Sequence, residues 1–180
     1  MTTGSKQDNI IDSYVALLSE QGLHDATIEA TARHCGLSKA GLLHHFPSRQ
    51  ALDAGLVSRL RTLIDDDVAA MAQAPERAVH YYLASSLDEA SPLERMVVAA
   101  TRLAQSGNEE AAQVLRSGRD RWYALLVEAL GDPALAKLAL LAGDGLSYHL
   151  DITRGARDGF MGEGTLDELV ALLVNRQPAA

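Results

Sequence analysis

The 180-residue sequence predicts an all-α fold of about nine helices. Apolar residues recur at helical spacing along most of the chain, whereas no segment alternates apolar and polar residues with the β-branched enrichment of a strand. Helix-start signals, in which a cap residue precedes an acid or a proline, recur from one end to the other. The single cysteine, Cys35, excludes a disulfide framework within the chain, so packed helices must supply the stability.

The first helix is expected between Ser5 and Gly22. Ser5 and Asp8, three residues apart, form a capping box, and Gly22 is a C-terminal stop. The apolar face of this helix consists of Ile10, Ile11, Tyr14, Val15, Leu17 and Leu18.

Two short helices and one long helix follow. Thr27 caps the first short helix, Gly36 allows a left-handed turn, and Ser38 caps the second short helix. Ser48 then begins a longer helix that runs to about Gln73.

Four further helix starts lie beyond Pro75: Ser91-Pro92-Leu93-Glu94, Asn108-Glu109-Glu110, Asp132-Pro133 and Thr165-Leu166-Asp167-Glu168. In the first of these, Glu94 is expected to be the capping-box acid. The glycine-rich stretch from Gly155 to Gly164 is expected to be a mobile loop and not a phosphate cradle, because no Lys-Ser/Thr pair follows it.

The negative charge is unevenly distributed. The net charge is −8, yet residues 1–62 hold six basic and six acidic side chains, so the whole excess lies in the remaining 118 residues. Four of the six histidines also fall in the first segment. This asymmetry indicates two regions with different partners. Because the sequence has no leader or long apolar run, we expect a cytoplasmic protein without membrane contact.

The segment 27–46 has the spacing of a helix-turn-helix. Ala32 is small where the two helices would cross, Gly36 turns the chain, and Leu37 and Leu42 pack the second helix against the first. In a helix-turn-helix the second helix enters the major groove of DNA. Other helical hairpins share this spacing, so it is a weak signal of DNA binding.

The longer pattern from Gly22 to Leu52 resembles the N-terminal DNA-binding domain of TetR-family transcriptional regulators. The family run reads Gly-Val-Ser-Lys-Gly-x-Leu-Tyr-x-His-Phe-x-Ser-Lys-x-x-Leu. Here it is Gly36-Leu37-Ser38-Lys39-Ala40-Gly41-Leu42-Leu43-His44-His45-Phe46-Pro47-Ser48-Arg49-Gln50-Ala51-Leu52. The resemblance implies a DNA-binding domain at 1–52, a connecting helix at 53–74, and a helical ligand-binding and dimerisation domain at 75–180.

Phosphate contacts are the first roles that the resemblance implies. Thr27 and Ser38 cap helices whose N-termini can face phosphates, and Arg49 replaces a family lysine that neutralises one. His45 takes the place of a histidine that helps to bind the DNA backbone, while His44 stands where the family often has an aromatic residue facing DNA. A metal site at this histidine pair is a remote alternative, because adjacent helical side chains diverge by about 100°.

Base contacts are expected at the start of the second short helix. Lys39, Ala40 and Gly41 open the recognition helix, and Lys39 can donate to guanine. Glu29 either accepts from cytosine or lies on a solvated helix face. Leu43 replaces the family tyrosine and offers an apolar contact instead of a hydroxyl.

Two other positions carry their own expectations. Thr31 stands where isoleucine or leucine is common, so we expect a looser core beside Ala32. Cys35 is expected to be a small packed residue, with a redox switch as the alternative.

The remainder of the chain is expected to dimerise and to bind a small molecule. Two-fold dimers read palindromes, and in the family the last two helices pair with their symmetry mates. The residues expected at the dimer interface are Leu138, Ala142, Gly145, Leu146, Leu166, Leu169, Val170 and Leu173. The residues expected to line the ligand pocket are Tyr81, Tyr82, Met96, Arg119, Trp122, Tyr123, Asp144, Tyr148 and His149, although ordinary packing is the alternative for each.

The interpretation that follows is a homodimeric repressor on a palindromic double-stranded operator, released by an unknown small-molecule effector. The alternatives are a ligand-responsive activator and a helical interaction protein of this fold without DNA binding. An enzyme is not expected, because no HExxH, GxSxG, Walker or dinucleotide motif occurs in the sequence. No cofactor or metal is expected.

Overall fold

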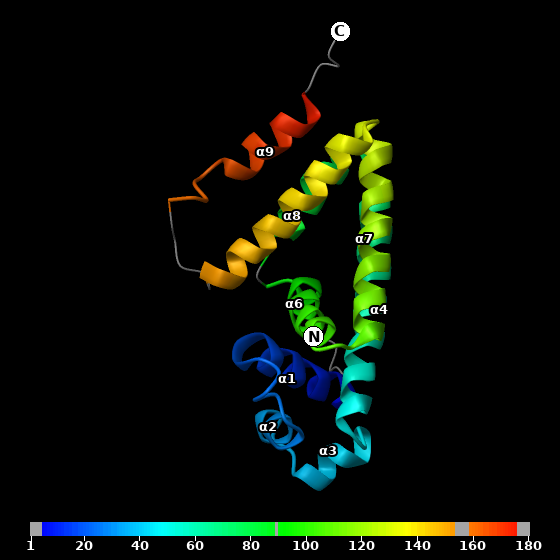
Figure 1. The fold of residues 1–180 in the computed structure, drawn as a ribbon, viewed down its shortest axis with the longest axis vertical. Coiled ribbons are helices and arrows are strands. Elements are labelled where there is room, and N and C mark those ends of the chain that lie inside the picture. The colour runs from blue at the N-terminus through cyan, green and yellow to red at the C-terminus, as the bar shows by residue number, and fades with distance from the viewer. Residues whose placement is uncertain (1–4, 89, 154–158, 176–180) are drawn as a thin grey trace. The chain divides into compact units, whose positions relative to one another are not determined.

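The computed structural model describes residues 5–88, 90–153 and 159–175, and every regular element in them is helical. The elements are α1 (Lys6–Gln21), α2 (Ile28–His34), α3 (Lys39–His45), α4 (Arg49–Ala72), the 3-10 turn η1 (Pro75–Arg77), α5 (Ala78–Ser85), α6 (Pro92–Gln105), α7 (Glu109–Leu130), α8 (Pro133–Thr153) and α9 (Thr165–Val174). Figure 1 shows their order along the chain. The predicted all-α fold of about nine helices is confirmed for these ranges.

The predicted N-terminal caps form in the first half of the chain. The Ser5 backbone N–H donates to the Asp8 carboxylate at 2.8 Å, and the Asp8 N–H donates to the Ser5 hydroxyl at 3.2 Å, which completes the capping box of α1. Thr27 and Ser38 accept backbone N–H bonds at 3.1 and 3.0 Å at the starts of α2 and α3. Local sequence therefore determines where these helices begin.

Two helix starts differ from the prediction. The Ser91 hydroxyl accepts the Glu94 N–H at 3.4 Å, but the Glu94 carboxylate accepts a hydrogen bond from the Ser147 hydroxyl on α8 at 3.0 Å instead of closing a capping box. Thr165 is the first residue of α9, and Gly164, with φ 90°, occupies the N-cap position. A tertiary contact replaces the expected local one at Glu94. Residues 155–158 of the expected mobile loop lie outside the described residues.

The chain divides into two compact units that interleave in sequence. The first unit consists of Met1–Leu63 and Arg95–Arg116, and the second of Ile64–Glu94 and Ser117–Ala180. Three helices, α4, α6 and α7, contribute residues to both units.

The first unit is built around the apolar face predicted for α1. Ile10, Tyr14 and Leu18 are fully buried, together with Leu42 of α3 and Leu52 of α4. The chain approaches closely at Gly55, where an added Cβ would lie 2.8 Å from Phe46 Cε1 and 2.9 Å from Ile11 Cδ1. Glycine at this position therefore allows α4 to pack tightly.

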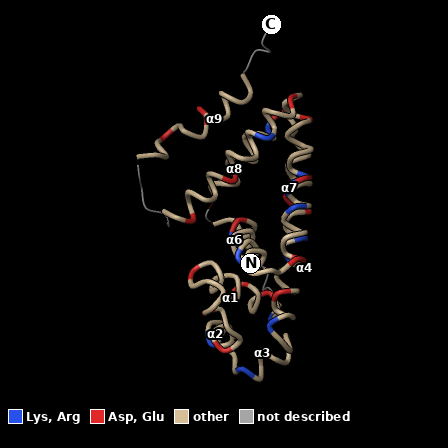
Figure 2. Tube along the Cα trace, viewed as in Figure 1, with Lys and Arg blue, Asp and Glu red and all other residues tan. Residues whose placement is uncertain are grey.

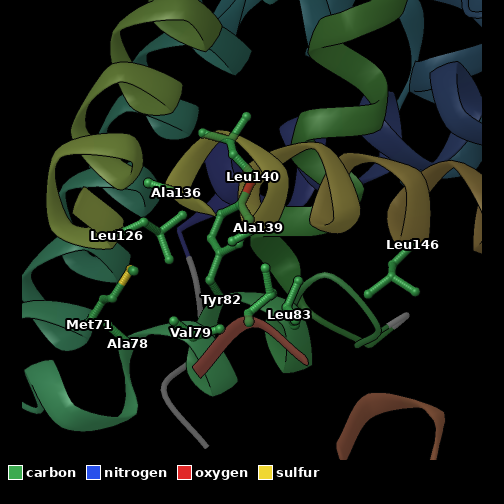
Figure 3. Close-up of a cluster of buried hydrophobic side chains, with 11 residues drawn as sticks. Met71, Ala78, Val79, Tyr82, Leu83, Leu126, Ala136, Ala139, Leu140 and Leu146 are labelled. Atoms are coloured by element: carbon green, nitrogen blue, oxygen red, sulfur yellow. The ribbon is translucent and has the colours of Figure 1, made fainter. Parts of the chain in front are cut away.

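The second unit has a separate apolar core, shown in Figure 3. Its buried members are Met71, Ala78, Val79, Tyr82, Leu83, Leu126, Ala136, Ala139, Leu140, Leu146 and Leu173. Tyr82 extends from α5 toward α8. A Cβ on Gly143 would lie 2.5 Å from Tyr82 Cε1, so α5 and α8 meet at this glycine. No helix among the described residues is long and apolar enough to span a bilayer.

Candidate DNA-binding surface and effector site

The turn between α2 and α3 has the construction that the sequence predicts. Gly36 adopts a positive φ of 71°, and the Leu37 N–H donates to the Ala32 carbonyl at 2.8 Å. Ala32 is 2% exposed and Leu42 is fully buried, so the two helices are fixed against the core of the first unit. Thr31 is also fully buried, but its hydroxyl donates to the Thr27 carbonyl at 2.8 Å. The buried hydroxyl of Thr31 is therefore satisfied within α2, and the looser core expected at this position stays a prediction.

The starts of α2 and α3 are open to solvent. Thr27, Ser38 and Ala40 are exposed residues, whereas Gly41 is partly buried. An added Cβ at Gly41 would lie 3.2 Å from the Ser38 hydroxyl, so this position suits glycine. Exposed helix starts with backbone N–H groups are surfaces that phosphate oxygens can approach.

Lys39 and Glu29 form an ion pair that joins the first turn of α3 to the first turn of α2. The pair lies at the surface, with both side chains more than half exposed. The Lys39 bond holds the pKa of Glu29 below its ordinary value. The two side chains expected to read bases therefore partner each other in the unbound chain.

The two histidines lie at the C-terminal end of α3. Their rings are 5.5 Å apart in a T-shaped arrangement, with His44 exposed and His45 partly buried. Leu43, which precedes them, is also partly buried. No group of three metal-binding side chains occurs among the described residues, so these histidines have no third ligand there.

Arg49, expected to neutralise a phosphate, points into the protein. Its guanidinium donates to the Ala26 carbonyl at 2.6 Å, the Leu23 carbonyl at 3.5 Å and the Asp53 carboxylate at 3.3 Å. It also lies 4.9 Å above the ring of Tyr14, whose hydroxyl donates to Asp53 at 2.5 Å. Burial and the Asp53 carboxylate raise the pKa of Tyr14. Each guanidinium nitrogen has a protein acceptor, which supports a bracing role for Arg49 within the first unit. The phosphate contact expected of Arg49 stays a prediction.

Several of the residues expected to line the ligand pocket converge in the second unit. The Asp67 carboxylate accepts hydrogen bonds from Trp122 Nε1 and from the Tyr81 hydroxyl, each at 2.8 Å. Burial and this carboxylate raise the pKa of Tyr81 to about 12. The ring of Tyr82 lies 6.0 Å from that of Trp122. Asp67 thus orients Trp122 and Tyr81. The sequence analysis singled out these two aromatic residues but not the carboxylate that orients them.

A second carboxylate, Glu94, lies in the same part of the unit. Burial raises the pKa of Glu94 to about 7, against the lowering effect of the Ser147 hydrogen bond. Nearby carboxylates add to the rise, and among them is Asp144. Asp144 is an exposed residue of α8, yet desolvation raises its pKa and Arg119 lowers it.

For four of the residues expected to line the pocket, no contact with Asp67, Tyr81, Tyr82 or Trp122 is described. Met96 is 2% exposed and belongs to the first unit. The Tyr123 hydroxyl donates to the Pro133 carbonyl at 3.4 Å. Tyr148 is 66% exposed, and the ring of His149 packs 5.3 Å from Phe160.

A cavity of about 520 Å³ opens beside Asp67 and Tyr81. Its walls come from the end of α4, from η1, from α5 and from the loop that follows α5, and they include Arg77, His80 and Asp88. Tyr81 is the one residue expected to contact ligand that lines it.

The residues expected at the dimer interface fall into two groups. Leu146 and Leu173 are 4% and 5% exposed and belong to the core of the second unit, where Ala142, Leu166, Leu169 and Val170 pack against them. Leu138 and Gly145 are exposed, and large apolar side chains on the same two helices are exposed as well: Leu141, Tyr148, Ile152, Leu172 and Val174. Figure 2 shows few charges along α8 and α9. The helices expected to dimerise therefore retain an apolar surface. Leu146 and Leu173 are buried within the single chain, whereas the other residues expected at the interface are partly or fully exposed and stay predictions.

Sequence reasoning missed Asp67, Glu94 and Ser147. Asp67 ends a run of three aspartates inside a helix, which is typical of a solvated face, and Glu94 has the spacing of a capping-box acid. Only the tertiary packing of α4, α6 and α8 distinguishes these residues from ordinary surface polar groups.

Two family models match the chain. The model described as bacterial regulatory proteins, tetR family, matches residues 10–54. The model described as tetracyclin repressor-like, C-terminal domain, matches residues 76–173. Together they cover the helix-turn-helix and most of the second unit.

Individual proteins agree with these matches. The HTH-type transcriptional regulator BetI of Serratia proteamaculans is 26% identical over 145 residues, which are 81% of this chain and 65% of that protein. The chain thus spans less than two thirds of this curated relative. A transcriptional regulator from Rhodococcus sp. Rha1 has the same fold, with a TM-score of 0.67, 21% identity and 95% of each chain covered. A regulator from Saccharomonospora viridis, solved in complex with choline, aligns with a TM-score of 0.61 and 18% identity over 94% of this chain and 93% of its own.

Proposed function

The chain belongs to the TetR family of bacterial regulatory proteins, and on that premise we propose that it is a homodimeric repressor released from a palindromic operator by a small-molecule effector. The observation that carries the DNA-binding part is the α2–turn–α3 unit, with capped and exposed helix starts and Lys39 at the first position of α3. This is a family of regulators and not of enzymes, and a DNA-binding regulator acts in the cytoplasm, where the chromosome lies.

We assign a separate role to each part of the chain. We assign DNA binding to residues 1–52, the connecting helix to 53–74, and effector binding and dimerisation to 75–180. Base reading is assigned to Lys39, Ala40 and Gly41, with Glu29 as the modulator of Lys39, because these residues surround the exposed start of α3.

Contacts to the DNA backbone are assigned to the rest of that surface. Thr27 and Ser38 present helix starts to phosphates, and His44 and His45 approach the backbone from the end of α3. Leu43 is available for a thymine methyl.

The dimer surface is assigned to the exposed apolar residues of α8 and α9. This surface keeps Leu138 and Gly145 from the expected interface and adds Leu141 and Leu172. In the single chain Leu138 is 54% exposed, Leu141 is 64% exposed and Leu172 is 69% exposed. Large apolar side chains exposed on two successive helices are typical of a subunit interface. A two-fold pair of recognition helices would then match a palindrome.

The effector site is assigned to the second unit. Trp122, Tyr81 and Tyr82 combine apolar faces with the polar groups of Asp67 and Asp144, which is the composition of a small-molecule site. The choline complex of the Saccharomonospora viridis regulator supports a small ligand at this fold. An effector releases DNA only if it binds the DNA-free conformation more tightly.

A second candidate, a protein of this fold without DNA binding, is favoured by two contacts. Lys39 is paired with Glu29, and Arg49 is directed inward, so two of the expected cationic contacts are engaged within the chain. The exposed starts of α2 and α3 favour the regulator.

Selection of bound sequences from random duplex DNA by the full-length protein tests the proposal. An enriched palindrome, bound with an affinity that falls steeply with salt, is the expected result. No enrichment at low salt would favour the second candidate. Transcription from the selected site, with and without the protein, separates a repressor from a ligand-responsive activator.

A further inference from the structure

We propose that the cavity between the end of α4 and α5 is a binding site for a small organic monocarboxylate, whose carboxylate pairs with Arg77 and His80. This site is separate from the aromatic group assigned to the effector, because neither Trp122 nor Tyr82 lines the cavity. The inference goes beyond the proposed function, since it does not depend on whether the protein binds DNA. The volume of the cavity and the distribution of charge along its walls carry it.

The cavity lies within the second unit and has a volume of about 520 Å³. All of its lining residues fall between Asp67 and Ser91, so one continuous stretch of chain, with η1 between its two helices, forms the whole site. The space stays open because Ala70 of α4 and Ala84 of α5 are too short to fill it. A volume of this size is typical of pockets that hold small organic ligands.

One wall of the cavity is apolar and held in place. Met71 is 1% exposed and belongs to the apolar core of the second unit, where Figure 3 shows it among the buried side chains. The Tyr81 hydroxyl donates to the Asp67 carboxylate at 2.8 Å, and Asp67 is itself fixed by Trp122 Nε1 at 2.8 Å. A wall that is already ordered lowers the entropic cost of binding a ligand.

The end of the cavity near η1 is basic. Arg77 is the last residue of η1 and is exposed, and His80 lies one turn later on α5 and is partly buried. Among the described residues, neither side chain makes an ion pair or a hydrogen bond, so both can bind a ligand. A guanidinium forms two parallel hydrogen bonds with a carboxylate, and an imidazole N–H can donate one more.

The opposite end of the cavity is acidic, which limits the ligand to one negative charge. Asp88 lines the cavity eight residues after His80, about two helical turns further along the chain. Asp67 lines it from α4. The described partners of both carboxylates are neutral donors: Ala90 N–H for Asp88, and Trp122 and Tyr81 for Asp67. These charges would repel a second carboxylate or a doubly charged phosphate, whereas an uncharged apolar body avoids that repulsion.

Calorimetric titration of the full-length protein without DNA tests the class of ligand. The probes are benzoate and cyclohexanecarboxylate, each compared with its neutral amide, which has the same shape. Terephthalate supplies a second carboxylate on the same ring as benzoate, and all titrations are made at constant ionic strength. We expect a monocarboxylate to bind, and its amide and terephthalate to bind at least about tenfold more weakly.

Charge variants test the basic end. Arg77→Gln should weaken binding of the monocarboxylate about tenfold, because the paired hydrogen bonds and the charge are both lost. Arg95→Gln is the matched control, since it removes an exposed arginine of α6 that does not line the cavity, and it should leave the affinity unchanged.

Filling the cavity gives an independent test of its position. Ala84→Leu should occupy the space and weaken binding about tenfold or more. Ala72→Leu adds the same volume at an exposed position of α4 outside the cavity and should have no effect. Circular dichroism checks the helices of each variant. If Ala84→Leu does not fold, Ala70→Leu at an exposed position of the lining supplies the same comparison.

The results separate this inference from the proposed function. Equal binding of acid and amide, tighter binding of terephthalate, no binding of either monocarboxylate, or an affinity that Arg77→Gln leaves unchanged overturns the carboxylate site. Any of these results leaves the operator selected from random DNA intact. Monocarboxylate binding that Arg77→Gln weakens, in a protein that selects no operator, supports this site and overturns the regulator.

Discussion

Glu29 and Lys39 form an ion pair across the α2–α3 turn, at the end of the protein that would face DNA. In the unbound chain, this pair directs the Lys39 ammonium of α3 toward Glu29 of α2. A DNA base competes with Glu29 for the same donor, so the pair opposes indiscriminate binding and favours sites where the base contact is good.

Glu29→Gln should therefore raise the affinity for all DNA sequences by a few-fold and reduce the ratio of specific to nonspecific binding. Fluorescence anisotropy with the selected operator and with scrambled duplex measures both affinities. Glu20→Gln, which removes an exposed acid near the end of α1, is the matched control. A loss of affinity in Glu29→Gln would instead assign Glu29 a direct base contact.

Arg49→Lys should destabilise the first unit by about 1–3 kcal/mol, because lysine keeps the charge but cannot bond Leu23, Ala26 and Asp53 together. Urea unfolding measures the loss, and Asp53→Asn should produce a similar one. Arg49→Gln, which also removes the charge, should leave the salt dependence of DNA binding unchanged if Arg49 only braces the first unit. A folded Arg49→Gln protein with weaker and less salt-dependent binding would assign Arg49 the phosphate contact expected from the sequence.

Glu94 makes stability depend on pH in a defined direction. Its pKa in the folded protein is about 7, above the ordinary value of 4.5. Its contribution to the free energy of unfolding is therefore fully present below about pH 4.5 and is lost as the pH rises through about 7. The shift corresponds to at most about 3 kcal/mol. Glu94→Gln should thus gain stability over the wild type between about pH 5 and pH 8 in denaturant unfolding. A constant difference between the two proteins across this range would show that Glu94 ionises normally.

Leu138→Glu should prevent formation of the proposed dimer and leave the subunit folded, because 54% of the Leu138 side chain is already exposed in the single chain. Sedimentation measures the oligomeric state, and circular dichroism checks the helices. Leu146→Ala is the counterpart, since its side chain is 4% exposed and its truncation should cost about 2–5 kcal/mol of folding stability. If the Leu138→Glu protein is still a dimer, the subunit interface does not include Leu138.

Gly143→Ala should destabilise the second unit by about 1–3 kcal/mol, because the new Cβ would meet Tyr82 Cε1 at 2.5 Å. Gly145→Ala, two residues further along α8, meets nothing within 4 Å and should be neutral or slightly stabilising in the subunit. Thermal unfolding of the two variants gives the comparison. Equal effects would mean that α5 withdraws easily from α8.

Local signals predicted the helix starts, and tertiary contacts decided the roles of charged residues. The caps at Ser5, Thr27 and Ser38 depend on residues within one turn, so sequence spacing was sufficient for them. Arg49 instead bonds carbonyls 23 and 26 residues earlier in the chain, a pairing that no local pattern encodes.

The apolar faces of the last helices show the same limit. Helical spacing identified α8 and α9 as amphipathic, but it could not distinguish the stripe that packs inside the subunit from the stripe that remains exposed. Leu146 and Leu138 belong to one helix and one residue type, and only the position of α5 and α9 separates their environments.

The interleaving of the two units limits how such a regulator can be recombined with others. Arg102 of α6 donates to the carbonyls of Leu18 and Ser19 at the end of α1, so the unit that holds the helix-turn-helix is braced by a segment encoded far downstream. A gene fusion cut once after residue 52 or 63 would separate α1 from this support. Chimaeras built from this protein should instead carry residues 95–116 along with the helix-turn-helix, so exchanging the second unit requires several junctions rather than one.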